Sequence, residues 1–574
     1  MMRKAAYTEK SMPACTKGPA LAIGAAIFMS PAFSQDRTQA RSMVITGRGV
    51  VATSQTLASQ AGAMVLARGG NAMDAAIAAN AALGVVEPMM NGIGGDLFVL
   101  YREATTGKLH GINASGYAPK LLTGELVRKS GAYGMPQDGI HSVTVPGCVD
   151  GWEKLHKRFG RMKWPDLFKP AIHYAKNGFP VTELIAGSWD AGQGKLAADD
   201  NARRIFLDKE GNAPRVGSIH KNAELARALE LIAGRGAQAF YRGPIAQAIL
   251  KTSKRLGGAM SAEDLAEFQA EWVDVISTTY RGWTVYELPP NGQGMAALEM
   301  LNLFERFPLS VWGLRSPETW HHKIEAQKLA YTDLNRYLGD PRFGSVPVKE
   351  LISKSYAASR AGLIKPDEAQ CAQNAGNIST AGDTIYLTVA DRDGNIVSLI
   401  QSLYLSFGSG VAVDDYGFHL HNRGALFTLE EGHVNELKPR KRPFHTIIPG
   451  YMEKGSLHLG FGIMGGFNQA QAHAQFVSNV VDHGMNIQAA LEAARFTKLN
   501  FSGCDVMIEA RVAEDTLSGL RKKGHFLQMQ GDFSSWMGGG QAVLHDSRAK
   551  VNYGASDPRK DGAAVPEPDA YFQD

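Results

Sequence analysis

The regular alternation of polar and apolar residues is clearest between positions 382 and 402. Residues 384–389 place threonine and tyrosine side chains between isoleucine, leucine and valine, which is the period of a strand with one buried face. Residues 393–395 read Asp-Gly-Asn, and Asp-Gly tolerates the positive φ of a tight hairpin turn. Residues 396–400 are mostly apolar and return as a second strand. The pattern therefore predicts a β-hairpin over 382–402.

The rest of the chain mixes strand and helix patterns. Towards the N-terminus we predict strands at 47–53, 97–101 and 109–113, and helices at 54–68 and 71–86. The stretch 142–365 is mainly helical, with helices at 151–159, 164–177, 221–233, 244–256, 262–271, 295–307 and 318–338 and a strand pair at 278–288. The C-terminal part adds a strand at 456–461 and helices at 469–482 and 487–496.

Composition narrows the functional classes only a little. The chain has 574 residues, of which 44% are hydrophobic and 20% are charged, with a net charge of +4. This is an ordinary globular composition, long enough for one large or two ordinary cores. The charges are balanced, and a single basic run at 438–442 is more typical of a solvated loop than of a nucleic-acid site. We therefore expect no nucleic-acid partner.

The N-terminus has the features of a secretory signal. Basic residues precede an uncharged apolar run at 18–29, and small residues follow it, so we predict a signal peptide over 1–34 with cleavage after Ser34. The apolar run is too short to span a bilayer comfortably. We therefore expect an exported, periplasmic protein with no membrane span once the signal is removed. The alternative is a disordered tail or a buried helix.

The cysteines and histidines indicate no metal site. Cys15 would leave with the signal, so the remaining Cys148, Cys371 and Cys504 allow at most one intramolecular disulfide and fit no zinc spacing. The predicted helix 318–338 contains His321, His322 and Glu325. That spacing is not a recognised ligand pattern, and we interpret it as interhelix packing. We expect no metal and no organic cofactor.

Thr384 follows Gly-Asp directly at the mouth of the predicted hairpin. If the Asp383–Thr384 bond were cut, Thr384 would carry both a hydroxyl nucleophile and a free α-amine that can act as its base. Threonines begin many strands, so this position alone is weak evidence. Three further stretches strengthen it: Ser-Leu-Tyr-Leu-Ser-Phe-Gly-Ser-Gly at 402–410, Gly-Phe-Gly-Ile-Met-Gly-Gly-Phe-Asn at 460–468 and Gly-Ala-Ser-Asp-Pro-Arg-Lys-Asp-Gly at 554–562.

Together these stretches resemble the γ-glutamyltransferase family of N-terminal-nucleophile hydrolases, over about residues 47–564. The resemblance implies an α+β fold, a four-layer αββα sandwich with a large, mainly helical region in the N-terminal subunit. It also implies self-cleavage before Thr384 into a large subunit, 35–383, and a small catalytic subunit, 384–574, which remain together as a heterodimer. Members cleave γ-glutamyl amides such as glutathione and pass the acyl group to water or to an amine.

The resemblance implies roles for individual residues. Thr384 matches the nucleophile and Ser402 falls where the family usually has a second threonine that hydrogen-bonds it, although an ordinary solvent-facing serine remains open. Gly465 and Gly466 match the oxyanion glycines; without the resemblance, a plain turn is the simpler interpretation. A tetrahedral intermediate needs such preorganised donors.

The residues that hold the substrate depart from the family pattern. The stretch that usually carries a carboxylate-binding arginine begins here at Ser115 and has none, and the usual Ser-Ser pair reads His445-Thr446. The positions that usually hold the α-ammonium are Tyr404, Arg423 and Leu426. An arginine repels an ammonium and a leucine offers it no partner, so γ-glutamyl recognition is altered.

Three hypotheses follow. The first is a γ-glutamyltransferase-family amidohydrolase that acts on glutathione-like amides. The second is the same catalyst with another acyl specificity, similar to the cephalosporin (glutaryl) acylases of the family, in which Arg423 or His445 holds a terminal carboxylate. The third is a non-catalytic exported binding protein on the same fold. The sequence leaves the natural substrate and the acceptor open.

Overall fold

The predicted hairpin is present, and it lies inside a sheet. In the computed structural model, which describes residues 39–371, 383–500 and 503–571, strands β10 (Asp383–Ala390) and β11 (Ile396–Tyr404) pair antiparallel with Leu387 opposite Leu399. Gly394 takes a φ of 83° in the turn between them. Because β2 (Val50–Thr53) flanks β10 on its other side, Thr384 lies on a central strand.

Two seven-stranded sheets dominate the described residues. The first follows the order β19 (Ala563–Pro566), β2, β10, β11, β3 (Asp96–Arg102), β4 (Leu109–Ala114), β7 (Glu271–Val273). The second follows the order β1 (Val44–Thr46), β18 (Val551–Ser556), β17 (Gly540–Asp546), β13 (Leu457–Ile463), β12 (Gly450–Lys454), β9 (Trp283–Glu287), β8 (Ile276–Tyr280). Smaller sheets join β14 (Phe496–Thr497), β15 (Asp505–Glu509) and β16 (Phe526–Gln530), and β5 (Phe179–Pro180) with β6 (Ile219–His220).

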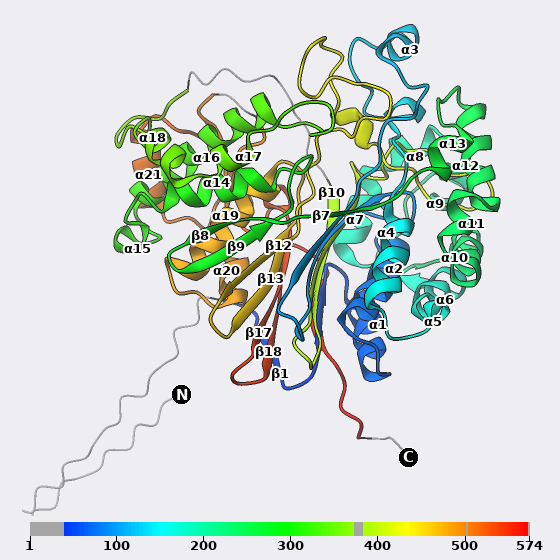
Figure 1. The fold of residues 1–574 in the computed structure, drawn as a ribbon, viewed down its shortest axis with the longest axis horizontal. Coiled ribbons are helices and arrows are strands. Elements are labelled where there is room, and N and C mark those ends of the chain that lie inside the picture. The colour runs from blue at the N-terminus through cyan, green and yellow to red at the C-terminus, as the bar shows by residue number, and fades with distance from the viewer. Residues whose placement is uncertain (1–38, 372–382, 501–502, 572–574) are drawn as a thin grey trace, which may run out of the picture. The chain divides into compact units, whose positions relative to one another are not determined.

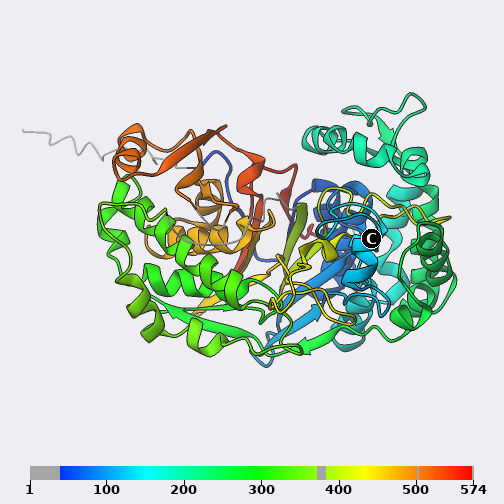
Figure 2. The same cartoon turned by 90° about the horizontal axis from the view of Figure 1, so that it is seen from above.

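The two large sheets face each other, and helices cover their outer faces (Figures 1 and 2). A core that includes Phe98, Tyr386 and Tyr451 lies between the sheets. A second core joins the first sheet to helices on its side, through residues such as Ile77 and Leu387, and a third core does the same for the second sheet. This is the predicted αββα sandwich.

The helices divide between the two sides. Those on the side of the first sheet include α1 (Thr56–Ala67), α2 (Ala72–Val86), α4 (Cys148–Phe159), α5 (Trp164–Leu167), α6 (Lys169–Asn177), α7 (Glu183–Ala191), α8 (Gln193–Ala197), α9 (Asp200–Phe206), α10 (Ala223–Arg235), α11 (Ala237–Tyr241), α12 (Pro244–Arg255) and α13 (Ala262–Ala266). Those on the side of the second sheet include α14 (Gly294–Phe304), α15 (Leu309–Trp312), α16 (Pro317–Tyr337), α17 (Val348–Leu351), α18 (Lys354–Ala361), α19 (Asn468–Val481), α20 (Ile487–Glu492) and α21 (Glu514–Lys522). A short α3 (Gly124–Lys129) and the 3₁₀ turns η1 (Ile140–Ser142), η2 (Arg423–Leu426) and η3 (Ser535–Met537) lie in connections.

Local sequence patterns correctly predicted the start of helix α2. Asn71 caps α2, since its side chain accepts the N–H of Asp74 and the Asp74 carboxylate accepts the N–H of Asn71. Such a reciprocal pair satisfies two backbone donors that a helix start leaves open. Fourteen of the fifteen α2 residues are buried, so its alanines let the helix pack closely against neighbours on every side.

Three predicted helix boundaries were wrong. The helix predicted at 262–271 ends at Ala266, because residues from Glu271 pair with β4 as strand β7. The helix predicted at 487–496 ends at Glu492, and Phe496 pairs with Ile508 in β14. The helix predicted at 164–177 is interrupted at Phe168, before a new helix with proline in its first turn. In the first two cases pairing with a distant strand outweighed local helix propensity.

The cysteine count was interpreted correctly. Cys371 and Cys504 form one disulfide, and Cys148 is a free, buried thiol. None of the helices among residues 39–371, 383–500 and 503–571 is both long and apolar enough to cross a membrane. The predicted signal peptide over 1–34 and most of the connector before Thr384 fall outside the described residues, so both remain predictions.

Candidate active site

Thr384 and Ser402 contact each other across the β10–β11 hairpin. Their hydroxyl oxygens lie 3.1 Å apart, and both side chains are buried. The register of the two strands shifts between Asp383 and Ile385. Ser402 Oγ also accepts the backbone N–H of Tyr404 at 2.7 Å, so this serine is held at the end of β11. The interpretation of Ser402 as a solvent-facing serine was wrong.

Gly465 and Gly466 form the turn between β13 and α19. Their φ values are +122° and +58°, a region that residues with a Cβ rarely adopt. Among the described residues no acceptor contacts either backbone N–H of the pair, although both carbonyls accept bonds from the first turn of α19. Two unengaged donors on a rigid turn can bind an oxyanion.

Arg423 is the centre of a buried charged cluster. Its guanidinium is fully buried and donates from Nε to Asp96 Oδ2 at 2.9 Å and from Nη1 to Thr446 Oγ1 at 2.8 Å. Its Cζ atom lies 4.7 Å from the ring centre of Tyr404, a favourable cation–π distance. Nη2 has no partner among the described residues, and neither has Asp96 Oδ1.

His445 is the second side chain that donates a hydrogen bond to Asp96 in this cluster. Its Nδ1 accepts the backbone N–H of Ile447 at 3.3 Å, so the ring proton sits on Nε2, which donates to Asp96 Oδ2 at 2.7 Å. Burial and the charge of Arg423 lower the pKa of His445 to about 4. Burial raises the pKa of the Asp96 carboxyl, but Arg423 and His445 outweigh it and hold that pKa well below its ordinary value. The cluster is therefore an Asp⁻–Arg⁺ pair with a neutral histidine.

A close backbone approach brings Asp96 to Arg423. A Cβ at Gly94 would lie 2.1 Å from the carbonyl oxygen of His419, and the Gly94 carbonyl accepts the N–H of His421. Only glycine allows this approach. The Gly-Gly-Asp start of β3 is thus fixed against the segment that carries Arg423.

One continuous set of contacts joins the predicted site residues. Gln293 Nε2 donates to the carbonyls of Thr446 and Gly466, which connects the arginine cluster to the glycine turn. On the other side, Tyr404 connects the cluster to Ser402 and Thr384 through the contacts given above. Ser115 lies at the margin: its Oγ bonds Asn113 at 2.7 Å and lies 3.4 Å from Asn291, whose carbonyl accepts the N–H of His445.

Comparison with known proteins decides the family. The family model described as gamma-glutamyltranspeptidase matches residues 58–567. The chain belongs to this family. Over 527 residues it is 38% identical to the glutathione hydrolase-like YwrD proenzyme of Bacillus subtilis. This alignment covers 91% of this chain and 99% of that protein. It is 32% identical to the oxamate amidohydrolase proenzyme of Klebsiella pneumoniae over 532 residues, with coverage of 91% and 99%.

A solved structure agrees with this assignment. The cephalosporin acylase of Bacillus halodurans is 41% identical and superposes with a TM-score of 0.87, covering 94% of this chain and 100% of that one. These relatives are all named as hydrolytic enzymes. The protein is therefore a hydrolytic enzyme of the γ-glutamyltranspeptidase family with its N-terminal-nucleophile fold, and the non-catalytic alternative has no support.

Sequence reasoning missed three residues of this candidate site. Asp96, His421 and Gln293 were not singled out, yet Asp96 pairs with Arg423, His421 Nδ1 lies 3.4 Å from Asp96 Oδ2, and Gln293 bridges two segments. A signal existed for Asp96 alone, since a carboxylate that opens an apolar strand has to find a buried cation. The sequence did not show that this cation is Arg423.

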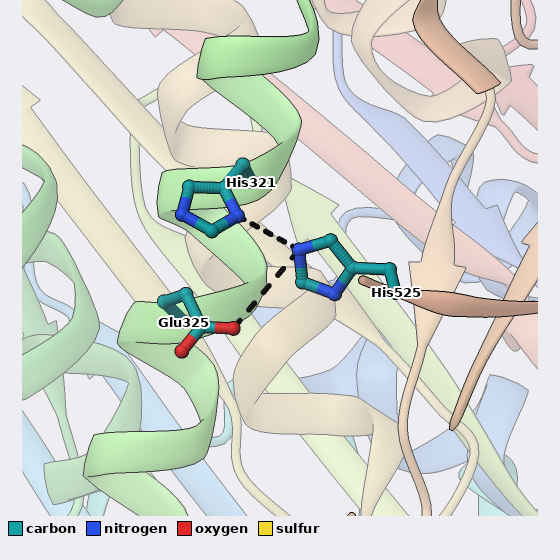
Figure 3. A group of neighbouring side chains, drawn as sticks. All are labelled: His321, Glu325 and His525. Atoms are coloured by element: carbon teal, nitrogen blue, oxygen red, sulfur yellow. Dashed lines mark hydrogen bonds and ion pairs between the residues drawn. The ribbon is translucent and has the colours of Figure 1, made fainter. Parts of the chain in front are cut away.

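The histidines of α16 lie away from this network. His321 and Glu325 project from one face of α16 towards His525 (Figure 3). His321 Nε2 donates to the Lys365 carbonyl, so its Nδ1 accepts from His525 Nε2 at 2.8 Å. The three residues are close enough for a metal ion, but the Lys328 ammonium already donates to Glu325 Oε1 at 2.7 Å. A buried cation at this carboxylate disfavours a second one, so we still interpret the group as structural packing. The packing is not between helices, as predicted, because Lys365 and His525 both lie in connecting segments.

Acid should destabilise the folded protein through its buried neutral histidines. The pKa of His445 is about 4 when folded, against 6.5 when exposed. Between these values the unfolded chain binds more protons, so stability falls as pH drops from 6.5 to 4, by at most about 3 kcal/mol for this residue. Urea unfolding at pH 7.5 and 5.0 measures the loss.

His445→Gln should reduce this pH dependence, because it removes one of the buried groups. The matched control is His173→Gln, on an exposed histidine, which should leave the pH dependence unchanged. Equal slopes for wild type and His445→Gln would contradict the assignment.

Proposed function

We propose that this protein is a self-processing amidohydrolase that cuts its own chain before Thr384 and then uses Thr384 to cleave amides whose acyl group ends in a carboxylate. The observation that carries the proposal is Arg423, whose Nη2 is buried without a partner among the described residues. Its guanidinium lies over the ring of Tyr404, whose backbone N–H donates to Ser402 Oγ. A buried, unsatisfied guanidinium edge is costly unless a ligand completes it. A carboxylate is the ligand that its geometry suits best.

Processing needs only groups near Thr384. Its hydroxyl attacks the carbonyl carbon of Asp383, the peptide C–N bond breaks, and the acyl group moves to Oγ1 while the nitrogen becomes an amine. Water then hydrolyses this ester, leaving a carboxylate on Asp383 and a free α-amine on Thr384. The relatives named above as proenzymes support such a step. The Ser402 hydroxyl, 3.1 Å from the nucleophile, can stabilise the reacting oxygen.

The same threonine then performs the chemistry on the substrate. Its α-amine takes the hydroxyl proton, directly or through a water, as Oγ1 attacks the amide carbonyl. The N–H groups of Gly465 and Gly466 are the candidate donors for the oxyanion. The amine half of the substrate then takes up this proton from the α-amine of Thr384 and leaves. The acyl group remains as an ester on Thr384. Water or an amine acceptor releases it.

Arg423 would set the acyl specificity. Asp96 and Thr446 fix two edges of the guanidinium, so Nη2 is presented in one orientation. At the positions where typical relatives hold the α-ammonium, Leu426 is apolar and Arg423 is itself positive, so neither side chain can bind it. A glutaryl-type acyl group fits this arrangement, and the likeness to a cephalosporin acylase supports it.

A second candidate is a γ-glutamyl substrate such as glutathione. In the part of the chain that the structure describes, Asp96 Oδ1 is also buried without a partner, and a carboxylate oxygen there could accept an α-ammonium while Arg423 holds the α-carboxylate. The glutathione hydrolase-like relative supports this alternative. Asp96 would then take over a role that other positions fill in typical members.

Three anilides separate the two candidates. Glutaryl and γ-glutamyl p-nitroanilide differ only in the α-ammonium, and valeryl p-nitroanilide lacks the carboxylate as well. We expect kcat/KM to be highest for the glutaryl compound and lower by about 10- to 100-fold for the valeryl one, the usual range for losing a charge-assisted hydrogen bond. A γ-glutamyl preference would favour the second candidate. Equal rates for all three would remove Arg423 from substrate recognition.

Ser402→Ala should slow both processing and turnover, by about 10- to 100-fold, because one hydrogen bond to the reacting oxygen is lost. Ser402→Thr keeps the hydroxyl and should retain most activity. Ser398→Ala is the matched control on the same strand, since Ser398 bonds Tyr386 instead. Rates are followed by the appearance of the two fragments and by anilide hydrolysis. A fully active Ser402→Ala variant would contradict the role.

Export remains part of the proposal. We infer that residues 1–34 direct the protein to the periplasm and are removed after Ser34. Intact-mass measurement of the mature protein tests this, since the large fragment would start at Gln35.

A further inference from the structure

The two cysteines of the disulfide lie on opposite sides of the proposed cleavage point in the sequence. Cys371 precedes Thr384 and belongs to the large subunit, whereas Cys504 follows it and belongs to the small subunit. The bond is therefore within one chain only while the Asp383–Thr384 peptide is intact. Cutting that peptide leaves the disulfide as a link between two chains.

Hydrogen bonds hold the same end of the large subunit against the small one. We define the tail as residues 365–371. Its Ala369 N–H donates to the Lys523 carbonyl at 2.7 Å, the Lys523 ammonium donates to the Pro366 carbonyl at 2.8 Å, and the Cys371 carbonyl accepts from Gly503 at 3.2 Å. Lys523 and Gly503 both belong to the small subunit.

Helix α16 holds the tail from its other side. Lys328 Nζ donates to the Gln370 carbonyl at 3.1 Å, and the Gln370 N–H donates to Glu325 Oε2 at 3.2 Å. The Lys365 carbonyl accepts from His321, which in turn meets His525 of the small subunit (Figure 3). The cluster of His321, Glu325 and His525 thus lies at a junction of three segments, and Lys328 and Glu325 are almost fully buried in it.

We propose that this junction is a clamp that keeps the large subunit's C-terminal tail bound to the small subunit after processing, with Cys371–Cys504 as an interchain disulfide. The clamp rests on the proposed self-cleavage. Hydrolysis of the Asp383–Thr384 bond consumes one water and leaves the disulfide unchanged, so no oxidant enters the step. The new chain end at Asp383 then stays within twelve residues of a covalent anchor, at most about 40 Å away.

The clamp changes what holds the two subunits together. Two separate chains dissociate on dilution or in denaturant, because their association depends on concentration. A covalent link turns reassembly into an intramolecular event with a high effective concentration. Cys371 is exposed and Cys504 is buried, so a reductant can reach the bond from the tail side.

Mass spectrometry of the processed protein tests the clamp. Without reductant we expect one species, heavier by one water than the uncut mature chain, and after reduction two species, 35–383 and 384–574. Cys371→Ser and Cys504→Ser should each give two species without reductant. The matched control is Cys148→Ser, on the free buried thiol, which should still give one. Two species from unreduced wild type would overturn the clamp.

Mapping of unreduced proteolytic peptides makes the two proposals distinguishable. A Cys371–Cys504 peptide pair in a protein that stays one chain after reduction would overturn self-cleavage, and with it the interchain link. Two chains without that pair would overturn the clamp alone and leave self-cleavage standing.

Hydrogen exchange adds a local readout: the amides of Ala369 and Gln370 should exchange slowly in processed wild type and faster in Cys504→Ser. Fast exchange in both would overturn the clamp.

Discussion

Thr384→Ala is expected to leave one uncut chain and to lower anilide hydrolysis by at least about 10³-fold, the usual cost of removing a catalytic nucleophile. The variant lacks the oxygen that would attack the Asp383 carbonyl, and without cleavage no α-amine forms to act as base. Denaturing gel electrophoresis under reducing conditions shows the fragments, and a p-nitroanilide assay measures the activity.

Thr388→Ala is the matched control for this experiment. Thr388 lies on the same strand, is equally buried and bonds the Val397 carbonyl at 2.9 Å. Its loss should cost some stability but leave processing intact. The appearance of normal fragments from Thr384→Ala would show that another residue cuts the chain.

Arg423→Gln is expected to have the second large effect. It removes the guanidinium that pairs with the buried Asp96 carboxylate, and breaking a buried ion pair from one side costs about 3–5 kcal/mol. It should also lower kcat/KM for glutaryl p-nitroanilide by about 10- to 100-fold, while valeryl p-nitroanilide changes little. Urea unfolding and the two kinetic assays measure these effects.

A double variant separates stability from recognition. Arg423→Gln with Asp96→Asn removes both charges, so most of the lost stability should return, because no buried charge is left unpaired. The preference for a carboxylate-ending substrate should stay lost. If the double variant kept the glutaryl preference, Arg423 would have no part in binding that carboxylate.

The elements that the sequence predicted well depend on short-range signals. The alternation of 384–389 and the Asp-Gly turn after it are sufficient to define the hairpin, and Asn71 defines the start of α2 through its own neighbour Asp74. The proximity of Thr384 and Ser402 followed from this hairpin together with the family resemblance. Their 3.1 Å contact is a local consequence of strand pairing.

The remaining parts of the site depend on long-range contacts that no local pattern contains. Asp96 and Arg423 are 327 positions apart, and their pairing requires the backbone approach at Gly94. The proposed substrate positions come from the resemblance and stay a prediction, and the sequence did not show that Arg423 is paired on two edges. The helix predicted at 262–271 failed for the same reason, since β4 recruits its last residue into a sheet.

The strand pairing near the two ends of the described chain also permits a circular permutation of the sequence. Strand β1 pairs with β18 and β2 pairs with β19, so residues near both ends of the described chain lie side by side. A linker between these ends would allow a circular permutant that starts at Thr384, since nearby termini tolerate such rearrangement. Once its initiator methionine is removed, that polypeptide would carry the threonine amine from synthesis. Acyl transfer could then be measured without any maturation step.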